Sequence, residues 1–81
     1  MTITIKLING EEIKLDAKEN DWEGIKIDLD NHKYTEINSG KYYSPHENTA
    51  ANRMGIRAFK EFNEPRLIPI SSIVDISKTK I

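Results

Sequence analysis

The chain has 81 residues, no cysteine, a charged fraction of 31% and a net charge of −1. A chain of this length makes one small domain with a thin core, expected here to span residues 1–81. The lack of cysteine excludes disulfides and thiolate metal sites. No apolar run approaches the roughly 20 residues that cross a bilayer, and the apolar start alternates with polar residues as a strand does. We therefore predict a cytoplasmic protein without membrane contact.

Alternating apolar and polar residues predict two strands at the start of the chain, over residues 2–8 and 11–16. Asn9-Gly10 lies between them, and this dipeptide is a strong signal for a β-hairpin. A three-residue loop with Gly10 in a left-handed conformation is one of the common ways to close such a hairpin. The sequence therefore predicts an antiparallel pair here.

The apolar residues of the two strands choose the register of this hairpin. A two-residue loop would place Lys6 opposite Ile13 and mix the two faces. The three-residue loop pairs Ile5 with Ile13 and Ile3 with Leu15, which keeps the apolar residues on one face. We predict the second register.

Residues 17–24 form a polar connection that contains the single tryptophan, Trp22. Alternation resumes over residues 24–30, which predicts a third strand. Asp30-Asn31 favours a turn, and residues 33–37 are a weaker strand.

The stretch from Ser44 to Phe62 has the features of a long amphipathic helix. Ser44 and Glu47 have the spacing of a capping box, and Pro45 occupies the first helical position. On a helical wheel the apolar residues Ala50, Ala51, Met54, Gly55, Ala58, Phe59 and Phe62 share one half. Pro65 disfavours helix in the residue before it, so the helix should end near Phe62.

The final segment, residues 66–77, alternates in two pieces that predict a split last strand. Ser71-Ser72 favours a short turn between the pieces, and Pro69 favours an edge position. Residues 78–81 are expected to form a loose tail.

These elements predict an α+β domain in the order β-β-β-β-α-β, with the last strand split. One strongly bent antiparallel sheet, or a small open barrel, would be packed by the single helix. The NGE start and the IPISSIVDI ending are similar to SH3-like and Sm-like barrels, in which a short turn precedes the last strand. That resemblance covers about a quarter of the chain and implies the bent sheet alone. The long helix between late strands departs from these families, so no functional residue is transferred.

No catalytic or metal-binding pattern stands out. Asp28, Asp30 and His32 alternate and would converge on one face of a strand, where they could hold a divalent cation. The same residues are also what the solvent face of a half-buried strand requires. Two histidines, His32 and His46, have no partner set by spacing. We predict no enzymatic activity, no metal and no cofactor.

Charge is distributed unevenly, with a balance of −4 over residues 1–40 and +3 over residues 41–81. On the predicted helix His46, Arg53, Arg57 and Lys60 fall on one face, with Tyr42 and Tyr43 just before it. Such a face could follow a phosphate backbone while the tyrosines stack on bases. The isoelectric point of about 6.1 argues against this nucleic-acid-binding alternative.

Our leading prediction is a non-catalytic binding protein that contacts another protein, as an inhibitor or adaptor of the kind encoded by phages and other mobile elements. Ile56 lies within the basic face, and an apolar residue with a charged rim is typical of interfaces. Trp22 lies in an acidic loop that offers a second contact surface. An unpaired edge strand would also allow a homo-oligomer. The predicted partner-binding residues are Arg53, Ile56, Arg57, Lys60, Asp21, Trp22 and Glu23.

Overall fold

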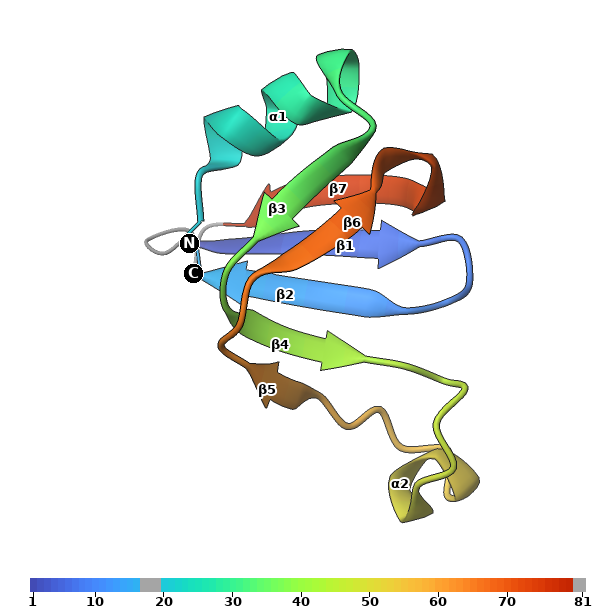
Figure 1. The fold of residues 1–81 in the computed structure, drawn as a ribbon. Helices are drawn as coiled ribbons and strands as arrows, with labels where there is room; N and C mark the ends of the chain where they lie inside the picture. Colours follow the sequence, from blue (N-terminus) through green and yellow to red (C-terminus); the bar gives the residue numbers. More distant parts are fainter. Residues whose placement is uncertain (17–19, 80–81) are drawn as a thin grey trace.

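The computed structural model describes residues 1–16 and 20–79 and shows an α+β fold with antiparallel sheets (Figure 1). The strands are β1 (Thr2–Leu7), β2 (Glu12–Asp16), β3 (Tyr34–Ile37), β4 (Gly40–Tyr43), β5 (Lys60–Phe62), β6 (Arg66–Pro69) and β7 (Ile73–Thr79). The helices are α1 (Trp22–Asn31), α2 (Ala50–Arg53) and the 3-10 turn η1 (Ile70–Ser72). The predicted fold class is confirmed, although the helices lie elsewhere in the chain.

The larger sheet has the strand order β5-β4-β2-β1-β7, and β3 pairs with β6 in a second sheet of two strands. The larger sheet is bent but does not close into a barrel, because β5 and β7 remain at its two edges. In Figure 1 the β3–β6 pair crosses in front of β1 and β2, so one face of the larger sheet is covered there.

The first hairpin has the predicted register. Ile5 pairs with Ile13, and Ile3 pairs with Leu15. Gly10 has a φ of 92°, the left-handed conformation that the three-residue loop requires. The alternation of apolar residues and the Asn9-Gly10 turn signal indicated the same register, and together they were sufficient to predict this hairpin.

The core lies between the covered face of the larger sheet, the β3–β6 pair and α1. Its buried apolar side chains are Ile3, Ile5, Ile13, Leu15, Ile25, Ile37 and Ile68. Six of these seven come from strands, so the sheets supply most of the buried surface.

The predicted strand over residues 24–30 is wrong, because this segment belongs to helix α1. Ile25 is buried, whereas Ile27 is exposed, so the alternating residues do not share a face. Trp22, Ile25 and Leu29 have the i, i+3, i+7 spacing of a helix face. That spacing was present in the sequence but was outweighed by the period-two pattern.

The predicted helix from Ser44 to Phe62 is also wrong, since only the four residues of α2 are helical there. Glu47 does not cap Ser44; its carboxylate receives hydrogen bonds from Tyr42 and Lys60 instead. Gly55 adopts a φ of 75° just after α2, which ends the helix.

The C-terminal prediction of two strand pieces around a turn is confirmed by β6, η1 and β7. Pro69 lies in β6, an edge strand, where its missing N–H is tolerated. The prediction of a loose tail over residues 78–81 is wrong for its first two residues. Lys78 and Thr79 are still in β7 and pair with Ile3 and Thr2, and residues 80–81 lie outside the described residues.

Candidate partner-binding arm

The segment between β4 and β5, residues 44–59, is an arm that contains α2. In Figure 1 α2 (yellow) lies beyond the ends of β4 and β5, at the opposite end of the molecule from α1. The arm carries several of the residues that the sequence singled out for partner binding. Its shape therefore decides which of them can act together.

Side-chain hydrogen bonds to the backbone hold the first half of the arm. Asn52 Nδ2 donates to the carbonyl oxygens of Ser44, at 2.9 Å, and Glu47, at 2.7 Å. The Thr49 hydroxyl accepts from the Asn52 N–H at 3.1 Å and so caps α2. His46 Nε2 lies 2.6 Å from the carbonyl oxygen of Asn9, which connects the arm to the first hairpin. The arm is thus fixed both internally and to the sheet.

An ion pair joins the arm to β5. Lys60 Nζ lies 2.6 Å from Glu47 Oε2, and the Tyr42 hydroxyl donates to Glu47 Oε1 at 3.3 Å. The hydrogen bond from Lys60 lowers the pKa of Glu47, and the same contact raises the pKa of Lys60. Lys60 therefore uses its charge within the molecule.

The Glu47 pKa predicts an acid-sensitive contribution to stability. Because the pKa of Glu47 is lowered by folding, its contribution is complete above the ordinary glutamate value of 4.5 and is lost as the pH falls through the folded-state pKa. We expect the difference in unfolding free energy between wild type and Glu47→Gln to shrink between about pH 6 and about pH 3. Urea unfolding at several pH values measures it.

Glu64→Gln is the matched control for this experiment. Glu64 is exposed and makes no hydrogen bond or ion pair with the described residues. The difference for this variant should not follow the same acid profile. Equal pH profiles for the two variants would contradict the role of the Glu47–Lys60 pair.

The second half of the arm lies against the uncovered face of the larger sheet. Arg57 Nη1 is 3.1 Å from Glu12 Oε2, and the guanidinium lies 5.5 Å from the ring centre of Tyr43. Glu12 is buried. Its carboxylate oxygen Oε2 lies beside the Arg57 guanidinium, but the two groups do not have the geometry of a hydrogen bond. Phe59 packs on Tyr43 with ring centres 5.9 Å apart. The positive charge of Arg57 thus offsets the negative charge of the buried Glu12 carboxylate.

The tip of the arm, residues 53–56, presents apolar side chains to solvent. Met54 is 72% exposed and Ile56 is 52% exposed. Arg53 beside them is exposed, and its guanidinium donates a hydrogen bond to Asn48 Oδ1 at 3.1 Å. The tip therefore offers two apolar side chains and a cation that no carboxylate of the described residues neutralises.

The structure brings together only part of the predicted partner-binding set. Arg53 and Ile56 both belong to the tip, whereas Arg57 and Lys60 lie farther along the chain in their ion pairs. The expectation that these residues share one helix face is wrong, because α2 ends at Arg53. The exposed apolar residue that the sequence reasoning missed is Met54, which it assigned to the packed face of the helix.

The predicted acidic loop around Trp22 is the start of α1. Asp21 is the N-cap residue, although its side chain makes no capping hydrogen bond, and Glu23 forms an ion pair with Lys26 at 3.5 Å. Trp22 is half-buried and packs against the core. Lys26 and Lys78 lie 5.7 Å and 5.5 Å from its ring centre. Trp22 thus has a packing role, at the end of the molecule opposite the arm.

The residues of the nucleic-acid alternative do not form one surface. Tyr42 lies on the same face of β4 as the core, because it pairs with Ile13, while Tyr43 pairs with Glu12 on the other face. His46, Arg57 and Lys60 each make a contact within the molecule. No continuous track of free cations and stacking rings results from these positions.

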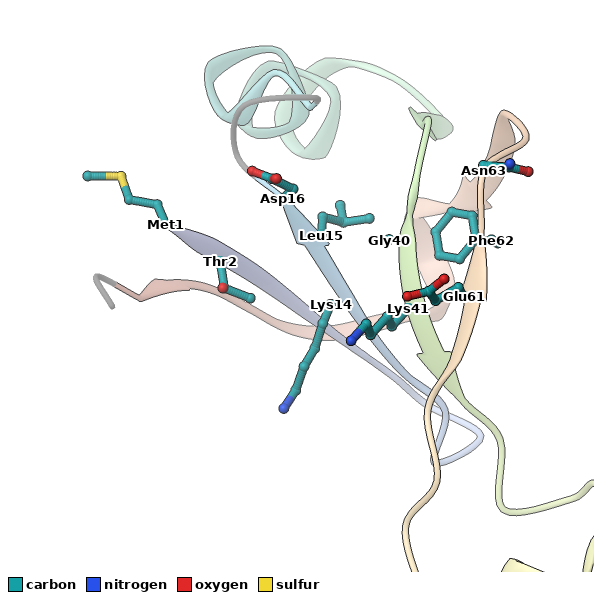
Figure 2. Close-up of a pocket in the computed structure, with 10 residues that line it drawn as sticks. All are labelled: Met1, Thr2, Lys14, Leu15, Asp16, Gly40, Lys41, Glu61, Phe62 and Asn63. Atoms are coloured by element: carbon teal, nitrogen blue, oxygen red, sulfur yellow. The ribbon is translucent and has the colours of Figure 1, made fainter.

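A hollow of about 710 Å³ lies on the uncovered face of the larger sheet and is open to solvent (Figure 2). Charged residues of both signs line it: Lys14, Asp16, Lys41 and Glu61. In Figure 2 their side chains extend away from the sheet in different directions. Lys41 in β4 and Glu61 in β5 are directly opposite each other in the sheet, so charges of opposite sign are neighbours there. The charged side chains that line this hollow do not converge on one point where a ligand could bind.

Helix α1 keeps Asp30 apart from Asp28 and His32, the other two residues considered for a metal. His32 Nδ1 lies 2.7 Å from Asp28 Oδ1, and the Thr35 hydroxyl donates to Asp28 Oδ2 at 2.8 Å. These hydrogen bonds lower the pKa of Asp28. Two residues along α1, Asp30 projects in a different direction. The described residues contain no group of three or more side chains able to hold a metal ion. Nor does any helix among them have the length and apolar character needed to span a membrane.

No protein-family model, curated protein or solved structure matches this chain.

Proposed function

We propose that this protein is a non-catalytic binding protein, an inhibitor or adaptor, that contacts another protein through the tip of its arm. The observation that carries the proposal is the exposure of Met54 and Ile56 at the end of a segment fixed by many hydrogen bonds. Ordering a segment of this length costs conformational entropy, and its tip returns little buried apolar surface within the chain, since Met54 and Ile56 are 72% and 52% exposed. Burial of the tip in a partner would offset that cost.

The fixed geometry also supports a binding role. A preorganised loop loses less freedom on association than a mobile one, so more of its contact energy appears as affinity. Apolar anchors beside an arginine are typical of the residues that dominate interfaces. Arg53 is the one predicted basic residue at the tip whose charge is not used by a neighbouring carboxylate, which favours a partner with an acidic rim around an apolar depression.

The nucleic-acid alternative has weaker support. Arg57 and Lys60 are paired with Glu12 and Glu47, which reduces the positive charge available to phosphates. Titration with a labelled oligonucleotide at several salt concentrations tests it. Binding that weakens strongly with salt and with Arg53→Glu would favour the alternative over the protein partner.

The test of the main proposal is capture of a partner with the tip altered. Tagged protein is incubated with nuclease-treated lysate of its source, and retained proteins are identified by mass spectrometry. The double variant Met54→Ser, Ile56→Ser should lose a defined partner, with affinity for the purified partner reduced at least about tenfold. Both side chains are exposed, so the fold should remain intact.

Leu67→Ser with Val74→Ser is the matched control. These two residues are also exposed, at 64% and 66%, but they lie in β6 and β7 and outside the arm. The control variant should retain the partner. A partner lost equally from both double variants, or retained by both, would show that the tip is not the contact surface.

A further inference from the structure

A second hollow, of about 390 Å³, lies on the core-facing side of β4 and β5, where the β3–β6 pair no longer covers the sheet. Its lining residues are Glu11, Tyr42, Ser44, Glu47, Phe62 and Arg66. The hollow is open to solvent, and its volume lies in the range of sites that hold small ligands. The rings of Tyr42 and Phe62 lie side by side, with centres 6.3 Å apart. They give the hollow an aromatic wall.

Arg66 is the unusual group of this hollow. Its guanidinium lies 5.2 Å from the ring centre of Tyr42 and 5.4 Å from that of Phe62, and the residue is half-buried. Within residues 1–16 and 20–79, no oxygen pairs with Arg66 or accepts a hydrogen bond from its guanidinium. Arginine presents five N–H donors in a planar fork that fits a carboxylate with two parallel hydrogen bonds. The aromatic rings position this fork, and no group in the described part of the chain takes up its donors.

The charges around the hollow restrict the ligand. Glu47 is neutralised by Lys60, whereas Glu11 makes no ion pair with the described residues. Arg66 and Glu11 thus leave the hollow without net charge. A phosphate dianion would be repelled by Glu11 more strongly than a carboxylate with a single charge. The aromatic wall favours a planar or apolar body attached to that carboxylate.

We propose that this hollow binds an aromatic monocarboxylate, with its carboxylate on the guanidinium of Arg66 and its ring against Tyr42 and Phe62. The same chemistry occurs in a free aryl acid and in the C-terminal residue of a peptide that ends in phenylalanine. This site is separate from the arm tip, and it stands whether or not the tip binds a protein.

The first test compares two probes on the wild-type protein, so it does not depend on any variant folding. N-acetyl-phenylalanine carries the carboxylate, and N-acetyl-phenylalanine amide has the same ring without the charge. Titration followed by NMR should show the acid shifting the Arg66 Nε–H and the ring signals of Tyr42 and Phe62. The amide should bind at least about tenfold more weakly, because it cannot form the paired ionic contact. Equal binding of both probes, or of neither, would overturn the proposal.

Two charge variants provide the second test. Arg66→Gln should lose binding of the acid at least about tenfold, and Arg66→Lys should recover only part of it because lysine lacks the planar fork. Glu11→Gln changes the charge by the same amount in the opposite sense, and should keep or strengthen binding. Weaker binding in Glu11→Gln, or unchanged binding in Arg66→Gln, would contradict the assigned geometry.

A third test distinguishes the two possible sources of the carboxylate, a free aryl acid and a peptide C-terminus. Phenylacetate and a five-residue peptide with a C-terminal phenylalanine are titrated under the same conditions, with the amidated peptide as control. Equal affinity of phenylacetate and the peptide would assign the site to free aryl acids. Tenfold tighter binding of the peptide, lost on amidation, would assign it to a chain terminus. Failure of every carboxylate probe would overturn the site without affecting the proposed role of Met54 and Ile56.

Discussion

Replacement of Ile13 by alanine is expected to lower the free energy of unfolding by about 3–4 kcal/mol. Ile13 is completely buried in β2 and pairs with Ile5 on one side and Tyr42 on the other. The substitution removes buried apolar surface and leaves a cavity where three strands meet. For a domain whose total stability is on the order of 5 kcal/mol, this loss would leave little of the native state at elevated temperature. Urea unfolding followed by circular dichroism measures it.

Ile8→Ala is the matched control, because the chemical change is identical and Ile8 is 75% exposed in the hairpin loop. Its effect should stay within about 0.5 kcal/mol. Ile13→Val, which removes one methyl group, should cost about 1 kcal/mol. Similar losses for Ile8→Ala and Ile13→Ala would show that the residue alternation does not place Ile13 in the core.

The strands β1, β2, β6 and β7 were predictable because strand signals and turn signals agreed there, whereas β4 and β5 were not predicted as strands. In the first hairpin, the apolar alternation and Asn9-Gly10 required the same register. At the C-terminus, Pro69 and the serine pair marked the break between β6 and β7 in the same way. Local preference and long-range pairing supported each other in both segments, so the sequence alone was enough.

The helices were mispredicted because the local patterns were ambiguous. In α1, the same residues satisfied a period of two and the helical spacing of Trp22, Ile25 and Leu29. In the arm, Asn52 hydrogen-bonds the backbone of Ser44 and Glu47, an interaction that competes with helix formation. Neither the helix at residues 22–31 nor the mostly non-helical arm can be predicted from a helical wheel or from residue alternation, because each depends on which strands lie nearby.

The candidate sites were also only partly predictable from the sequence. Ile56 and Arg53 were recognised from a helix face that does not exist, yet they lie together because the arm turns back at Gly55. The Arg66 donors, which have no partner among the described residues, could not be found from the sequence. They follow from the start of β6 lying near Tyr42 and Phe62, which β4 and β5 bring into contact. Such a site depends on strand pairing between residues far apart in the chain.

Gly40→Ala is expected to destabilise the protein by about 2–3 kcal/mol. Gly40 stands in β4 between Leu15 of β2 and Phe62 of β5. A Cβ atom there would lie 2.3 Å from the carbonyl oxygen of Lys14 and 3.0 Å from Leu15 Cδ2. The oxygen belongs to a paired strand and cannot turn aside, so β4 itself would have to shift. Thermal unfolding of the variant measures the loss.

Gly24→Ala tests the same chemical change where the neighbouring atoms can move. A Cβ atom at Gly24 would lie 2.5 Å from a carboxylate oxygen of Asp21, an exposed side chain without a capping hydrogen bond that can rotate away. Alanine is favoured over glycine inside a helix by about 1 kcal/mol, so this variant should be more stable than wild type. Opposite signs for the two variants would confirm both the close approach of β2 to β4 and the helical state of residues 22–31. If Gly40→Ala proves neutral, the register that brings Tyr42 to the Arg66 hollow is wrong.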